Sequence, residues 1–314
     1  DLHSFPTRRS SDLTNVYFPT AGIACHPLVP FAVAAGLSFF TSMGGISGAF
    51  LLLPFQMSVL GYVNPSVSAT NQFYNLIATP SGIWRYRREG RLVWPLAGTI
   101  AAGTLPGVLV GAFVRIYLLP DPGHFKIFAG LVLLYIGLRL AVSVWQERAA
   151  LGRRSGRRTA DTWEGGCQTL VWNGREIRLR FQERDFALST RSLLLLSLIV
   201  GLVGGIYGIG GGAIMSPFLV SLFGLPVYVV AGATLCATAL TSFAGVACYW
   251  LLAPFHAGIA VAPDWRLGLL IGLGGMCGMY AGARCQKFVP AAVIKVMLVL
   301  VLCFTALRYL LQAL

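Results

Sequence analysis

Eight long apolar segments, separated by short polar connections, constrain the fold of this chain more than any other feature. A helix needs roughly 20 apolar residues to cross the hydrocarbon core of a bilayer, and these segments are close to that length or longer. The mean hydropathy of +0.72 is also far above that of a soluble domain. We therefore predict an all-α polytopic membrane protein with spans at about 28–60, 65–84, 94–118, 124–145, 192–223, 227–252, 266–284 and 291–313.

The two halves of the chain resemble each other. The stretch GGISGAFLLLPFQMSVLG (44–61) aligns with YGIGGGAIMSPFLVSLFG (207–224), and matched residues follow in the same order through the rest of each half. The matches are Gly45/Gly208, Gly48/Gly211, Pro54/Pro217, Ala69-Thr70/Ala233-Thr234, Trp94/Trp265, Gly103/Gly274, Gly107/Gly278, Gly111/Gly282, Lys126/Lys295 and Arg139/Arg308. We predict two homologous membrane repeats, 28–145 and 192–313, of about four hydrophobic segments each.

A basic linker at 146–191 joins the two repeats. Within it, Asn173-Gly174 stands between two short alternating runs, a pattern that predicts a hairpin with a type I′ turn; an irregular solvated linker is the alternative.

At the N-terminus, residues 1–13 lack an apolar h-region and are similar to translated adapter sequence, so we expect them to be a non-native leader.

The positive charge of the chain predicts its orientation. The balance of 24 Lys and Arg against 11 Asp and Glu gives +13, which in a soluble protein would suggest nucleic acid. Here the positive residues cluster in short loops, as they do on the cytoplasmic side of membrane proteins, so we expect no nucleic-acid partner. The loop RYRREGR (85–91) and the linker are predicted to be cytoplasmic, whereas the counterpart of RYRREGR near Asp264 and Arg266 has lost this charge. The repeats are then inverted, with parallel repeats as the alternative.

An inverted repeat requires each glycine-bearing first segment to begin and end on one side. Residues 28–60 are too many for one span and too few for two, so we expect a broken or re-entrant helix in each repeat. Such a break exposes backbone N–H groups at the start of the second half-helix, and an anion satisfies them well. We predict that GISGA (45–49) and GIGGGA (208–213) form one anion site near the bilayer midplane, with close helix packing as the alternative. For Gly107/Gly111 and Gly278/Gly282 packing is the preferred explanation.

Polar uncharged side chains on the neighbouring spans complete the predicted site. Asn71 and Asn75 lie one helical turn apart, as do Thr234 and Thr238, and their amide and hydroxyl groups could coordinate an oxyanion. Hydrogen bonds between helices are the alternative role. The predicted substrate-binding residues are Gly45, Ser47, Gly48, Thr70, Asn71, Asn75, Gly208, Gly210, Gly211, Gly212, Thr234 and Thr238.

The sequence argues against an enzyme and against a cation carrier. Every Asp and Glu falls in a connection or in the leader, which disfavours metal coordination and a buried proton relay. There is no HExxH, paired carboxylate or GxSxG, and the seven cysteines lack metal-ligand spacing. GIGGGA fits a dinucleotide fingerprint, but an apolar helix precedes it and no acidic residue follows before Trp250. We expect no catalytic residue, no metal and no cofactor.

These motifs resemble the TauE/SafE (TSUP) family of sulfite-exporter-like permeases. The resemblance rests on GIGGG followed by proline, the later Ala-Thr, WRL and GxxxG patterns, and a basic loop between duplicated units, and it covers about 31–311. It implies transport of small sulfur-containing anions or organosulfonates, such as sulfite or sulfoacetate, across the bacterial cytoplasmic membrane. The first half departs from the pattern, with GGISGA in place of GIGGGA and Asn71 after the threonine.

The sequence therefore predicts a multi-pass permease of the bacterial inner membrane that works by alternating access. Its expected partners are a small anionic substrate and the lipid bilayer, and the sequence leaves open whether the protein forms a homo-oligomer. A permease for another small solute and a non-transporting membrane scaffold are the alternatives.

Overall fold

A computed structural model describes residues 15–43, 45–153, 167–181, 184–256, 258–286 and 291–313, so the predicted leader lies outside the described residues. Helices make up most of this structure. The helices are α1 (Leu28–Met43), α2 (Ala49–Ser58), α3 (Ser66–Arg88), α4 (Trp94–Tyr117), α5 (Pro122–Arg153), α6 (Thr190–Tyr207), α7 (Met215–Phe223), α8 (Val227–Leu252), α9 (Trp265–Cys285) and α10 (Ala291–Ala313). The strands are β1 (Val16–Phe18), β2 (Ile23–Cys25), β3 (Gln168–Trp172), β4 (Glu176–Phe181) and β5 (Arg184–Ser189), and a short 3₁₀ turn, η2 (Ala253–Phe255), follows α8.

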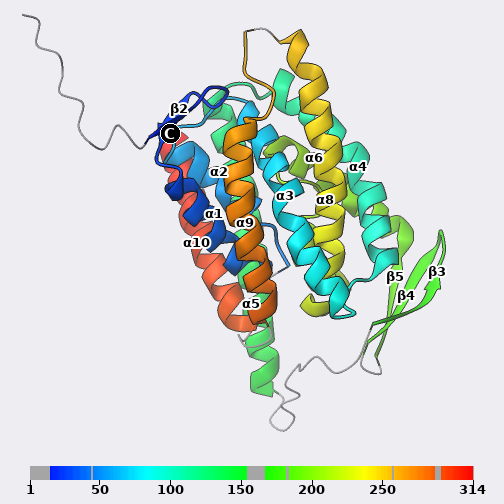
Figure 1. Ribbon diagram of the computed structural model, residues 1–314. Helices are drawn as coiled ribbons and strands as arrows, with labels where there is room; N and C mark the ends of the chain where they lie inside the picture. The colour runs from blue at the N-terminus through cyan, green and yellow to red at the C-terminus, as the bar shows by residue number, and fades with distance from the viewer. Residues whose placement is uncertain are drawn as a thin grey trace, which may run out of the picture.

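The helices coincide with the apolar segments and form one bundle. Four of them are long and apolar enough to cross a bilayer within the described part of the chain: Trp94–Tyr117, Pro122–Val142, Thr190–Tyr207 and Val229–Phe255. α3 and α8 pack side by side in the middle (Figure 1). α9 packs on α3 and α1, α4 packs on α8 and α6, and α5 packs on α10. The prediction of a polytopic helical membrane protein is confirmed at this level.

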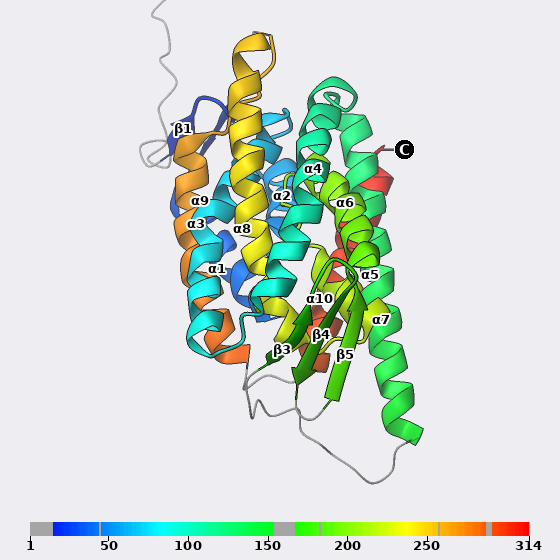
Figure 2. The same ribbon diagram turned by 90° about the vertical axis from the view of Figure 1, so that its right-hand side faces the viewer.

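Both glycine-bearing segments are broken helices whose two parts begin and end at one end of the bundle. α1 starts directly after β2, and Asn64, which follows α2, donates a 3.3 Å hydrogen bond to the Thr20 carbonyl in the same hairpin. We call this end, which also carries the α8–α9 connection, the upper end. α6 starts instead after β5, and Gly232, beyond α7, lies against Arg91 in the α3–α4 connection at the lower end. Accordingly α2 lies in the upper half of the bundle and α7 in the lower half (Figure 2).

Rows of glycine let the long helices touch through their backbones. A Cβ atom on Gly107 of α4 would lie 2.4 Å from the carbonyl oxygen of Leu198 in α6. A Cβ on Gly278 of α9 would lie 2.0 Å from the carbonyl oxygen of Ala35 in α1. Such distances leave no room for a side chain, so the packing explanation for these glycines is confirmed.

The linker forms a three-stranded antiparallel sheet at the lower end, ordered β3-β4-β5. The predicted hairpin is present, but its type I′ turn is wrong, because Gly174 is not among the glycines with positive φ. Instead the Asn173 side chain accepts hydrogen bonds from the backbone N–H groups of Arg175 (2.9 Å) and Glu176 (2.8 Å), an Asx-type turn. The third strand, β5, was not predicted and runs directly into α6.

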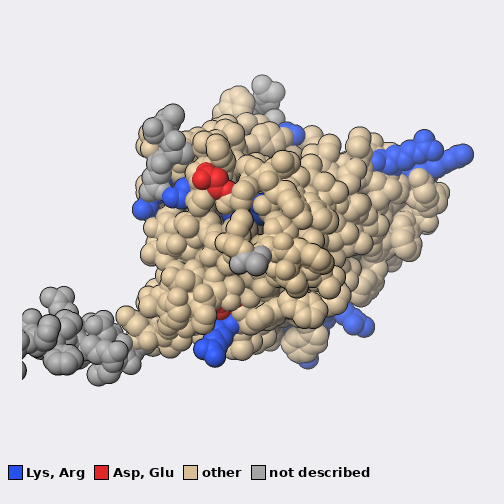
Figure 3. Space-filling view, turned by 90° about the horizontal axis from the view of Figure 1, so that it is seen from above, with Lys and Arg blue, Asp and Glu red and all other residues tan. Residues whose placement is uncertain are grey.

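Charge is unevenly distributed between the two ends of the bundle. Arg87 and Arg88 are exposed at the lower end of α3, the end of the bundle that also carries the arginine-bearing strands β4 and β5. Seen from the upper end, most of the surface is uncharged, and the Lys and Arg side chains in view lie mainly toward its rim (Figure 3). The described charges therefore follow the loop asymmetry that the sequence shows.

Candidate functional site

The two helix breaks meet at the side chain of Asn75, in the middle of α3. We call residues 45–48 break 1 and residues 208–214 break 2. Ser47 of break 1 donates its hydroxyl hydrogen bond to Asn75 Oδ1. Asn75 Nδ2 donates to the carbonyl oxygen of Ile209 in break 2 (2.9 Å) and to Ser242 Oγ in α8 (3.3 Å). One buried amide thus joins both breaks to both central helices.

Hydroxyl groups of α8 hold the breaks from the other side. Thr234 Oγ1 donates to the carbonyl oxygen of Gly45 (3.1 Å), and Thr241 Oγ1 accepts from the backbone N–H of Gly211 (3.0 Å). Thr234, Thr238 and Thr241 are fully buried, and so is Ser242. Ser216, at the start of α7, brings a further hydroxyl close to break 1, since a Cβ on Gly45 would lie 3.3 Å from its Oγ. The site is therefore lined with hydroxyl, amide and backbone groups.

Glycine is required in break 2 for two separate reasons. Gly210 has φ 74°, a left-handed conformation that other residues rarely adopt. Gly212 lies so close to α8 that a Cβ would be 2.3 Å from the carbonyl oxygen of Thr234. A side chain at either position would strain the turn or push break 2 away from α8.

Most of the predicted site residues lie at or beside this junction. Asn71, one turn above Asn75, donates from Nδ2 to the carbonyl oxygen of Ala49 (2.9 Å), and its Oδ1 has no hydrogen-bond partner in the described part of the chain. Gly48 lies at the edge, packed against the hydroxyls of Tyr74 and Ser38. The residues that the structure gathers around the two breaks are Gly45, Ser47, Gly48, Asn71, Asn75, Gly208, Gly210, Gly211, Gly212, Thr234 and Thr238.

Thr70 does not join this group. Its hydroxyl accepts from the backbone N–H of Asp264 (2.8 Å) and shares a 2.7 Å hydrogen bond with the Tyr62 hydroxyl, near the upper end. Asp264 in turn caps α9 through the N–H of Leu267 and accepts from Ala21 of the N-terminal hairpin. Thr70 therefore ties α3 to the α8–α9 connection instead of facing the breaks.

Sequence reasoning missed Arg115, two residues before the end of α4. The side chain is fully buried, its guanidinium lies 3.8 Å over the Phe125 ring, and its Nε donates to Ser68 Oγ at 3.4 Å. Gly208 of break 2 packs against the same Ser68. The available signal was a basic residue just inside the apolar segment 94–118, a position at which arginine usually reaches the headgroups.

The described residues contain no group of three or more His, Cys, Asp or Glu side chains that could hold a metal ion. The donor set at the junction is made of hydroxyls, amides and backbone groups, which suits an oxyanion better than a metal cation. Nothing in this arrangement supplies a nucleophile paired with a base.

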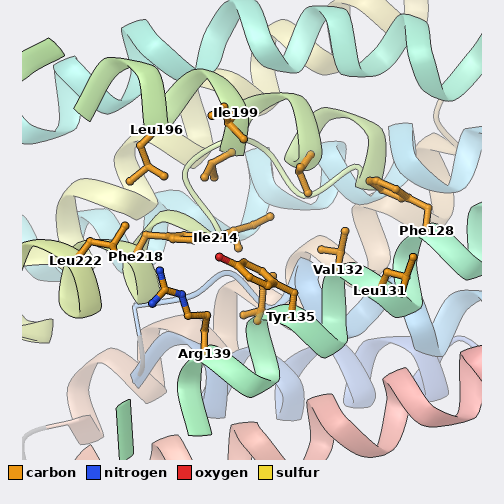
Figure 4. Close-up of a pocket in the computed structure, with 13 residues that line it drawn as sticks. Phe128, Leu131, Val132, Tyr135, Arg139, Leu196, Ile199, Ile214, Phe218 and Leu222 are labelled. Atoms are coloured by element: carbon orange, nitrogen blue, oxygen red, sulfur yellow. The ribbon is translucent and has the colours of Figure 1, made fainter. Parts of the chain in front are cut away.

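A separate cavity of about 540 Å³ opens between α5, α6 and α7 (Figure 4). Its lining is aliphatic and aromatic, and Arg139, which lies 6.0 Å from the Phe218 ring, is the charged residue among the described lining residues. The side chains point into the cavity from the three helices, as Tyr135 and Ile199 do in Figure 4. A wall of this kind offers a small anion no ring of donors, so the junction of the breaks is the better candidate site.

Comparison with known proteins gives one match. Neither the curated proteins nor the solved structures contain a match to this chain. The family described as sulfite exporter TauE/SafE matches residues 29–309, a range that runs from α1 through both helix breaks into α10. With this match over nearly its whole length, the chain belongs to the sulfite exporter TauE/SafE family.

Proposed function

We propose that this protein is a secondary transporter that moves small sulfur-containing anions or organosulfonates, such as sulfite or sulfoacetate, through the junction at Asn75. The family is one of membrane transporters, and its description names sulfite. The observation that carries the proposal is that one buried amide bonds both helix breaks at once. A ligand that replaces these bonds would act on both broken helices together.

The chemistry of the junction favours an oxyanion. Ser47 and Asn75 are hydrogen-bond donors, and a change of rotamer would release them from their present partners. The described acidic side chains stay away from this centre; the buried one, Asp264, is used as the cap of α9. Donors without a competing carboxylate favour anions over cations.

Alternating access requires two halves that can exchange roles, and inverted repeats provide them. Two hydrogen bonds support this arrangement. Tyr86 of α3 donates to the carbonyl oxygen of Ser42 at the end of α1 (3.0 Å), and Tyr249 of α8 donates to that of Gly205 near the end of α6 (3.3 Å). Tyr249 and Gly205 each stand 163 positions after their counterparts, the same shift that relates Gly45 to Gly208. The two broken helices also begin at opposite ends of the bundle, which fits inverted repeats.

The lower end is assigned to the cytoplasm of a bacterial inner membrane on the basis of its arginines. Repeat 28–145 and repeat 192–313 would then rock against each other around the junction, with linker 146–191 on the cytoplasmic side.

Flux into proteoliposomes tests the proposal. Sulfite, thiosulfate, sulfoacetate and a simple carboxylate are compared, with and without a pH gradient. We expect saturable flux of at least one sulfur anion, and loss of that flux in Asn75→Ala with normal yield of folded protein. Gln168→Ala, on an exposed position of β3, is the control that keeps full flux. Absence of flux for all four anions from folded protein would favour another solute or a scaffold, and normal flux in Asn75→Ala would move the site elsewhere.

A further inference from the structure

Arg115 is a buried cation whose charge the described residues do not neutralise. None of its side chain is exposed, and no ion pair within the described part of the chain involves it. Its Nη1 donates to the carbonyl oxygen of Leu119, its Nε to Ser68, and its Nη2 has no hydrogen-bond partner among the residues that the structure describes. A guanidinium in this position is costly unless an anion or several dipoles compensate it.

The Ser68 hydroxyl accepts a hydrogen bond from this guanidinium, the Tyr249 side chain interacts with it electrostatically, and both hydroxyls face the end of α6. Ser68 Oγ donates to the carbonyl oxygen of Ile206 (3.3 Å), and the Tyr249 hydroxyl donates to that of Gly205 (3.3 Å). Both hydrogen bonds are long, and both acceptors lie within three residues of Gly208, where break 2 begins. An anion at Arg115 could take over both hydroxyls and so release the end of α6.

The corresponding place at the lower end is compensated in a different way. There Tyr86 donates to Ser42, and Arg91 donates to the Gln286 side chain (2.7 Å) and forms an ion pair with Glu89 (3.0 Å). Each end of the bundle thus carries a buried arginine beside a tyrosine that bonds the end of a broken helix. Only the lower one has a carboxylate partner among the described residues.

We propose that Arg115, Ser68 and Tyr249 form a second anion-binding site, between the junction of the breaks and the upper end of the bundle. The ligand class is a small oxyanion, because a planar guanidinium with adjacent hydroxyls matches oxyanion geometry. The inference rests on the proposed function in that the same anion would occupy this site on entering or leaving. Binding here loosens α6 from α3 and α8, and so couples the anion to movement of break 2.

The test measures binding separately from flux. The purified full-length chain is heated with increasing sulfite, thiosulfate or sulfoacetate at constant ionic strength, and the concentration that gives half of the maximal rise in unfolding temperature is recorded. Arg115→Gln should raise this concentration about tenfold or more, the loss expected for charge-assisted hydrogen bonds, and Arg115→Lys by less. Arg266→Gln, an exposed arginine at the same end, is the matched control and should leave it unchanged.

The outcomes separate the second site from transport itself. If Arg115→Gln lowers the unfolding temperature but keeps the full anion-dependent rise, Arg115 only ties α4 to Leu119 and the proposal is overturned. If Arg115→Gln does not fold, Ser68→Ala and Tyr249→Phe decide. Each should raise the half-maximal concentration about threefold or more, and the proposal is overturned if either variant leaves this concentration unchanged. If the anion-dependent rise in unfolding temperature requires Arg115 but the protein shows no flux, the result would support the second site and refute transport.

Discussion

Replacement of Gly107 by alanine should test the contact between α4 and α6 that places break 2. The added Cβ would lie 2.4 Å from the Leu198 carbonyl oxygen and 2.6 Å from the Leu202 amide nitrogen. Ordinary contact therefore requires the two backbones to separate by about 1 Å, and overpacking of this kind costs about 1–3 kcal/mol. Alanine itself favours a helix over glycine by about 1 kcal/mol, so the matched control must carry the same exchange.

Gly98→Ala in the same helix provides that control, because no atom of the described residues lies within 4 Å of the added Cβ and the position is exposed. Unfolding followed by intrinsic fluorescence in detergent should show Gly98→Ala at least as stable as the parent and Gly107→Ala less stable than Gly98→Ala by about 1–3 kcal/mol. The flux of Gly107→Ala should fall as well, since break 2 follows directly after α6. Equal stability of the two variants would refute the backbone contact between α4 and α6.

Two further predictions concern the upper end and the sidedness of the chain. Asp264→Ala should lower the free energy of unfolding by about 1–2 kcal/mol, because it removes the cap of α9 and the acceptor of the Ala21 N–H. Asp185→Ala, which removes an exposed ion pair with Arg180 on β5, should change it little. Equal unfolding temperatures of the two variants would contradict the capping role. Cysteines at Arg266 and Gly174 should react with a membrane-impermeant maleimide from opposite faces of the membrane, with Gly174→Cys on the cytoplasmic face. Labelling of both from one face would rule out the proposed inverted topology.

The sequence alone determined the helices and their interruptions. Hydropathy places a helix wherever an apolar run is long enough, because backbone groups in lipid can be satisfied only within helices or by other protein groups. Clustered glycines mark the ends of α1 and α6, since Gly208 can adopt the left-handed turn that terminates a helix. The family resemblance followed from the same local patterns, and the match over 29–309 confirms it.

Only the tertiary structure decided which polar groups meet. Asn71, Asn75 and Thr70 lie on one helix within six residues, yet Asn75 bonds both breaks while Thr70 turns to Asp264. Their directions depend on how α3 rotates against α8 and α9, and periodicity within one helix does not specify that rotation. Arg115 was missed for the same reason: whether an arginine near a helix end reaches the headgroups or is buried depends on the ring and hydroxyls that neighbouring helices place over it, here Phe125 and Ser68.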